Sequence, residues 1–95
     1  MTALLLLALI AGPHDTLRVF NSHGHPMAVF ATIAGKTVER GVVAAGDTGK
    51  FAITIPPDLK QLYLQAYPPG DALSQITFTL EVKPEKPLFW SFEDS

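Results

Sequence analysis

The chain has 95 residues, of which 47% are hydrophobic and 17% charged, and its formal net charge at pH 7 is −2. This length corresponds to one small domain, and the apolar and aromatic content is too high for an intrinsically disordered chain. The near-zero charge and the scattered lysines and arginines exclude a basic nucleic-acid-binding surface and strong attraction to anionic membranes. The absence of cysteine excludes disulfides, thiolate nucleophiles, iron–sulfur clusters and zinc-finger sites.

The N-terminal segment contains an uninterrupted apolar run from Ala3 to Ala11. The run is about half the roughly 20 residues that a helix needs to cross a bilayer, and its length suits the hydrophobic region of a signal peptide. Small residues follow at Ala11 and Gly12, as signal peptidase requires. We therefore predict a signal peptide at residues 1–12 and a secreted or periplasmic protein that keeps no membrane anchor after cleavage. The alternative is a buried strand or helix, but the leucines at 4–7 lack strand alternation and β-branching.

After the apolar run, short alternating stretches are separated by Gly, Pro, Asp and Asn, a pattern typical of strands joined by turns. The pattern predicts seven strands, at residues 17–20, 27–33, 37–43, 50–55, 62–67, 76–82 and 88–92. Period-two alternation predicts an inward-facing set that includes Val19, Val29, Ile33, Phe51, Ile53, Leu64, Ile76, Phe78, Leu80 and Trp90. Gly41 is expected to mark a β-bulge.

No segment shows a sustained helical period, so we expect no helix longer than two turns. Seven regularly spaced strands favour two packed antiparallel sheets. The sequence therefore predicts an all-β fold: a seven-stranded antiparallel β-sandwich of the immunoglobulin or transthyretin-like type, formed by residues 13–95 as one domain.

Two segments carry a family likeness. Residues 17–29 consist of a predicted strand, a Gly-x-Pro turn at 24–26 and a second predicted strand. Residues 46–51, Gly-Asp-Thr-Gly-Lys-Phe, then lead into an alternating strand. Together they resemble the carboxypeptidase regulatory-like, or transthyretin-like, β-sandwich domains, over about residues 16–82. That resemblance implies a non-catalytic scaffold and no particular task, because such folds host many functions.

The second segment departs from the family pattern in the spacing of its acidic residue. The family has an Asp-x-x-Gly-x-Phe type of hairpin, whereas Asp47 lies only two positions before Gly49. Gly49 is expected to take the positive φ of a tight hairpin, and Phe51 to enter the core.

His23 and His25 are the candidate metal ligands. Histidines two positions apart share one side of an extended chain, His14 and Met27 are possible further ligands, and a His and Met set suits copper. The other interpretation is a solvated turn that happens to contain histidine. A periplasmic copper-binding protein is therefore the alternative function, while the leading prediction includes no cofactor.

Tyr63, Gln65 and Tyr67 are the candidate ligand-binding residues. If the residues between them face the core, these three side chains face outward together and can stack on a sugar or dock a partner. The other interpretation is a tyrosine half-buried at a sheet edge. No serine has a nucleophile-elbow context, and the aspartates lie at predicted turns or in the tail. We therefore predict an exported non-enzymatic module that binds a protein or a carbohydrate and does not bind nucleic acid.

Overall fold

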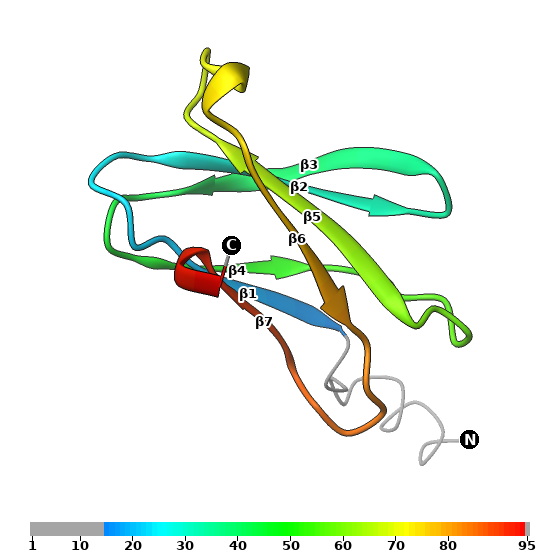
Figure 1. Cartoon of the computed structure of the whole chain (residues 1–95). Coiled ribbons are helices and arrows are strands. Elements are labelled where there is room, and N and C mark those ends of the chain that lie inside the picture. The colour runs from blue at the N-terminus through cyan, green and yellow to red at the C-terminus, as the bar shows by residue number, and fades with distance from the viewer. Residues whose placement is uncertain (1–14, 95) are drawn as a thin grey trace, which may run out of the picture.

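The computed structural model describes residues 15–94, so the predicted signal peptide lies outside the described residues. Seven strands form two sheets that face each other (Figure 1). The three-stranded sheet has the order β4 (Thr48–Ala52), β1 (Thr16–Phe20), β7 (Leu88–Ser91). The four-stranded sheet has the order β3 (Lys36–Val43), β2 (Met27–Ile33), β5 (Gln61–Tyr67), β6 (Ile76–Glu81).

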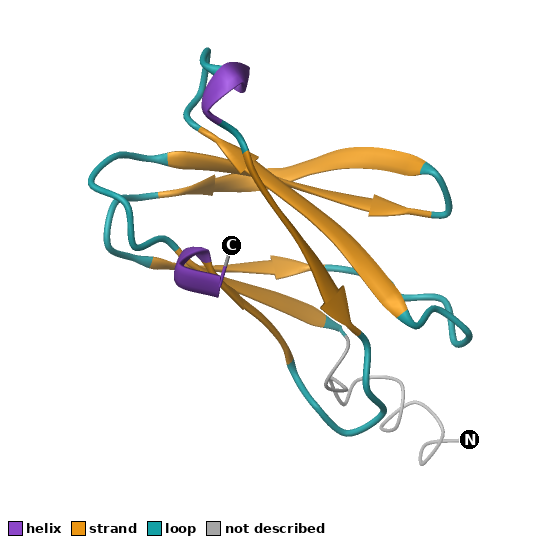
Figure 2. Ribbon diagram, viewed as in Figure 1, coloured by secondary structure: helices purple, strands orange, loops and turns teal. Residues whose placement is uncertain are grey.

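The described helices are two three-residue 3-10 turns, η1 (Ala72–Ser74) and η2 (Phe92–Asp94), drawn in purple in Figure 2. The predictions of an all-β chain, seven strands and no long helix are confirmed for residues 15–94. Within this range no helix is long and apolar enough to cross a membrane.

The core lies between the two sheets and follows the predicted alternation. Every member of the predicted inward set belongs to the buried cluster or packs against it. Trp90 is its largest fully buried side chain, and its ring stacks on Phe78 and meets Phe92 edge to face. The cluster draws on both sheets, so each alternating strand buries one face by covering the other sheet.

The prediction of an entirely antiparallel sandwich is wrong for one strand pair. The four-stranded sheet is antiparallel throughout, but β1 and β7 pair in parallel, with Leu17 opposite Leu88. Figure 1 shows the reason: the connection after β6 delivers the chain to the end of the sandwich where β1 begins. β7 therefore runs in the same direction as β1, a long-range relation of the kind that parallel pairing requires.

Strand boundaries differ most at β4, which spans 48–52 instead of the predicted 50–55. Ala52 pairs with Thr16, the first residue of β1, and the ladder is extended only by the Ile53 N–H, which donates to the Asp15 carbonyl at 3.1 Å. Ile53 is still buried, as predicted, because its alternation continues beyond the assigned strand. β7 is also shorter than predicted, since Phe92 begins η2.

Gly41 lies at a β-bulge, as predicted. The pairing of β2 with β3 shifts register between Val29 and Phe30, and Gly41 has a φ of 155°. A Cβ at this position would lie 2.6 Å from Cε1 of Phe51. Glycine is therefore required here both by the backbone conformation and by the ring packed against it.

The expected hairpin at Gly49 is wrong. Gly49 lies inside β4 without a positive φ, and the left-handed residue of this connection is Gly46, at 70°. β3 and β4 belong to different sheets, so the connection crosses between sheets instead of forming a hairpin. Gly49 is close-packed instead, because a Cβ there would lie 2.7 Å from a methyl carbon of Val43. Phe51 is partly buried and packs against the core, in line with the prediction.

Candidate functional site

The strand register places Tyr63, Gln65 and Tyr67 together on the outer face of the four-stranded sheet. The alternate residues of β5 are fully buried: Leu62, Leu64 and Ala66. Alternation along the strand therefore directs the other three side chains away from the core. Tyr63 is 41% exposed, and Gln65 and Tyr67 are half-buried. The candidate ligand-binding residues thus share one open surface.

A third aromatic ring, which sequence reasoning missed, joins this surface from β2. Phe30 lies opposite Gln65, and Ala28, two residues earlier in β2, lies opposite Tyr67. The Phe30 and Tyr67 rings are stacked, with centroids 4.8 Å apart and planes 17° from parallel. Alternation within β2 turns Phe30 outward, but only the pairing of β2 with β5 shows that it meets Tyr67. We call this surface the aromatic face, formed by Phe30, Tyr63, Gln65 and Tyr67.

Uncharged polar side chains surround the rings. Tyr63 lies between Thr32 of β2 and Thr79 of β6 in the sheet register. The amide of Gln65 donates to the side-chain oxygen of Gln75 at 3.2 Å, in an exposed position. The face therefore alternates rings with hydroxyl and amide groups that remain accessible to a ligand.

Charge is confined to the margins of this face. The two central strands, β2 and β5, contain no Asp, Glu, Lys or Arg. Glu39 lies opposite Phe30 on edge strand β3, and Glu81 closes edge strand β6. Glu81 is paired with Lys83 at 3.6 Å, with both side chains mostly exposed. The centre of the surface is consequently neutral.

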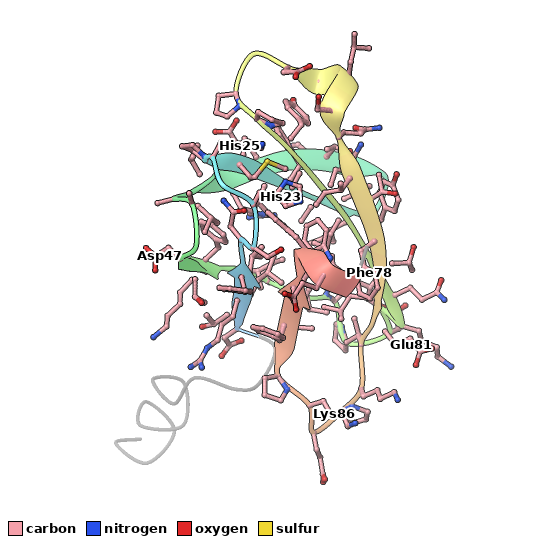
Figure 3. All side chains as sticks on the ribbon, turned by 60° about the vertical axis from the view of Figure 1, so that its left-hand side comes forward. His23, His25, Asp47, Phe78, Glu81 and Lys86 are labelled. Atoms are coloured by element: carbon pink, nitrogen blue, oxygen red, sulfur yellow. The ribbon has the colours of Figure 1, made fainter. Side chains whose placement is uncertain are left out.

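The structure brings the His23 and His25 side chains together (Figure 3). Their rings, in the loop between β1 and β2, are 5.5 Å apart and nearly perpendicular. Met27 is fully buried in the core, and His14 lies outside the described residues. Within residues 15–94 there is no group of three or more His, Cys, Asp or Glu side chains that would hold a metal ion.

The loop that carries the two histidines is organised by Asn21, a fully buried polar residue. Its Nδ2 donates to the carbonyls of His25 at 2.9 Å, Val43 at 3.1 Å and Ala44 at 3.3 Å. Its Oδ1 accepts from the His23 backbone N–H at 2.9 Å. One structural side chain thus holds the backbone at both histidines, and the His23 ring also packs edge to face against Phe92, with centroids 5.5 Å apart.

The backbone of Asn21 adds two further bonds to the opposite loop. Its N–H donates to the Asp47 carbonyl, and its carbonyl accepts from the Gly46 N–H, both at 2.9 Å. Asn21 therefore joins the loop after β1 to the loop before β4. An Asn at the end of an alternating strand is a sequence signal for such a side-chain turn, but its bonds to Val43 and Ala44 depend on the fold.

The described surface has hollows at other places than the aromatic face, and two of them are lined by no residue of that face. The larger, about 1160 Å³, lies at one end of the sandwich between residues 55–61 and 81–84. The smaller, about 320 Å³, lies between β3 and the end of β4.

Comparison with known proteins gives no relative: no family model, curated protein or solved structure matches this chain. The transthyretin-like resemblance therefore rests on its own residues, and function is argued from the surface of this chain alone.

Proposed function

We propose that this protein is an exported, non-enzymatic β-sandwich module that binds a neutral polysaccharide through its aromatic face. The observation that carries the proposal is the set of three rings on one open sheet face, with hydroxyl and amide groups between them. A pyranose ring has an apolar C–H surface and a rim of hydroxyls. An aromatic ring packs against the apolar surface of the sugar, and Gln and Thr side chains form hydrogen bonds with its hydroxyls.

The arrangement of polar groups favours a sugar over a protein partner. Protein interfaces usually have an apolar centre with a polar rim. Here Thr32 and Gln65 lie among the rings, which suits a ligand that is itself alternately apolar and hydroxylated. The absence of charge on β2 and β5 favours a neutral chain, because an acidic polysaccharide calls for Lys or Arg at the centre of the site.

Retention in native gels that contain neutral polysaccharides tests the proposal. Tyr63→Ala is expected to weaken binding about 30-fold, or about 2 kcal/mol, as for a central aromatic contact. Phe89→Ala is the matched control, since Phe89 is 47% exposed but lies on β7 of the other sheet. It should bind like the unmodified protein. No retention by any neutral polysaccharide, or equal binding by both variants, would overturn the proposal.

The alternative, a copper-binding protein, is favoured by the adjacency of the His23 and His25 rings. Two imidazoles are too few ligands for a tight copper site, so we expect Cu(II) to leave the melting temperature unchanged. A site with a Kd of about 1 μM would stabilise the fold by about 2.7 kcal/mol at 100 μM free metal, a melting shift of roughly 10–20 °C. A shift of that size, abolished by His23→Ala, would replace the polysaccharide proposal with the metal one.

We propose that this β-sandwich is of the transthyretin-like type. The three-plus-four arrangement of strands and the Gly-x-Pro turn between β1 and β2 support it. Export is part of the same proposal, because the polysaccharide that we propose as ligand lies outside the cytoplasm.

A further inference from the structure

Arg40 has an unusual position on edge strand β3. At the bulge, Val29 pairs with Gly41 and Phe30 pairs with Glu39, so Arg40 is the extra residue without a partner in β2. Its side chain is half-buried, and its Nε is buried with no hydrogen-bond partner among the described residues. A buried donor on a charged group is costly to leave without an acceptor, so the guanidinium of Arg40 is not fully satisfied by the described residues.

The side chain of Arg40 lines the smaller hollow, between β3 and the end of β4. The hollow has a volume of about 320 Å³ and is lined by a second cation, Lys36, and by Thr54. Its other walls are aliphatic, and no Asp or Glu lines it. Two positive charges therefore border one open surface hollow without a counter-charge in its lining.

Protection of the sheet edge explains part of this arrangement. Charged residues that point inward from an edge strand, together with a bulge, prevent edge-to-edge pairing of sheets. This accounts for Lys36 and Arg40 lying on the inner side of β3. It supplies no acceptor for Nε of Arg40.

We propose that this hollow binds the phosphate group of a small ligand. Arg40 presents a planar fork of N–H donors that matches phosphate oxygens, Lys36 adds a point charge, and Thr54 adds a hydroxyl donor. Donors that line one hollow from β3 and from the segment after β4 suit a tetrahedral oxyanion. The phosphate site shares no residue with the aromatic face, so the phosphate proposal can be tested independently of polysaccharide binding.

Titration of the full chain with inorganic phosphate, at a constant ionic strength set with chloride, tests the site, and amide chemical shifts report the binding. Saturable shifts are expected at the amides of Lys36, Arg40 and Thr54. Arg40→Gln should weaken binding at least about tenfold, the loss expected for a charge-assisted bond. Arg18→Gln removes an exposed arginine of β1 and should leave binding unchanged.

Lys36→Gln gives a second, independent variant at an exposed position, and it should also weaken phosphate binding. The spectra report folding and binding in the same experiment, so an unfolded variant is recognised at once. The proposal is overturned if millimolar phosphate gives no saturable shift, if Arg40→Gln and Arg18→Gln bind alike, or if acetate binds as well as phosphate.

Discussion

Asn21→Ala removes the side chain that joins two loops of the sandwich. Nδ2 has two hydrogens for its three carbonyl contacts, so these amount to two full bonds, and the bond to Oδ1 is a third. A buried hydrogen bond contributes about 1 kcal/mol net, so the expected loss of unfolding free energy is about 3 kcal/mol. In a domain of this size the melting temperature should fall by roughly 12–24 °C.

Urea denaturation followed by the fluorescence of Trp90, the single tryptophan, measures this loss directly, because that ring is fully buried in the folded state. Asn21→Asp keeps an acceptor for the His23 N–H but directs a carboxylate oxygen at three carbonyls, so it should destabilise at least as much. Ser22→Ala, at the exposed neighbouring position, should change stability by less than about 0.5 kcal/mol. A loss below about 1 kcal/mol for Asn21→Ala would refute the structural role assigned to this residue.

Further predictions concern packing and processing. Gly41→Ala should lower the free energy of unfolding by about 2 kcal/mol, because the new Cβ would lie 2.6 Å from a ring carbon of Phe51 and the backbone φ is 155°. Gly24→Ala is the control and should leave stability unchanged, since no atom lies within 4 Å of the added Cβ. Equal melting temperatures for the two variants would contradict this prediction. Phe78→Ala should lower the free energy of unfolding by about 2 kcal/mol. This is less than the roughly 3–5 kcal/mol usual for a fully buried Phe, because Phe78 is half-buried beside Trp90. A loss below about 1 kcal/mol in urea denaturation would contradict that packing. Intact mass of protein from the native host should show a chain that begins at residue 12 or 13, and recovery of the full-length chain from the cytoplasm would disprove export.

Local alternation was sufficient to predict most of this fold. In β5, for example, Leu62 and Leu64 alternate with Tyr63 and Gln65, so the buried and exposed faces follow from the sequence alone. The parallel pairing of β1 with β7 could not be predicted in this way, because it joins strands about 70 residues apart through the other sheet. Local patterns specify which side of a strand is buried, but not which strand lies beside it.

The same limit applies to the candidate site. Tyr63, Gln65 and Tyr67 could be grouped from one strand, but Phe30 enters the face only through the register of β2 with β5. The neighbours of Gly49 in the sequence predict a turn conformation, although the role of Gly49 is to make room for the Val43 side chain of the other sheet. Each of these features depends on contacts between segments that are distant in sequence.

The most direct test of the aromatic face is a chemical-shift titration of this domain with soluble neutral oligosaccharides. Polysaccharide binding through that face predicts saturable shifts concentrated on the amides and ring protons of β2 and β5, Tyr63 foremost, and their loss in Tyr63→Ala but not in Phe89→Ala. Shifts confined to the His23 loop or to the Arg40 hollow, or spectra that do not respond to any neutral oligosaccharide, would contradict it.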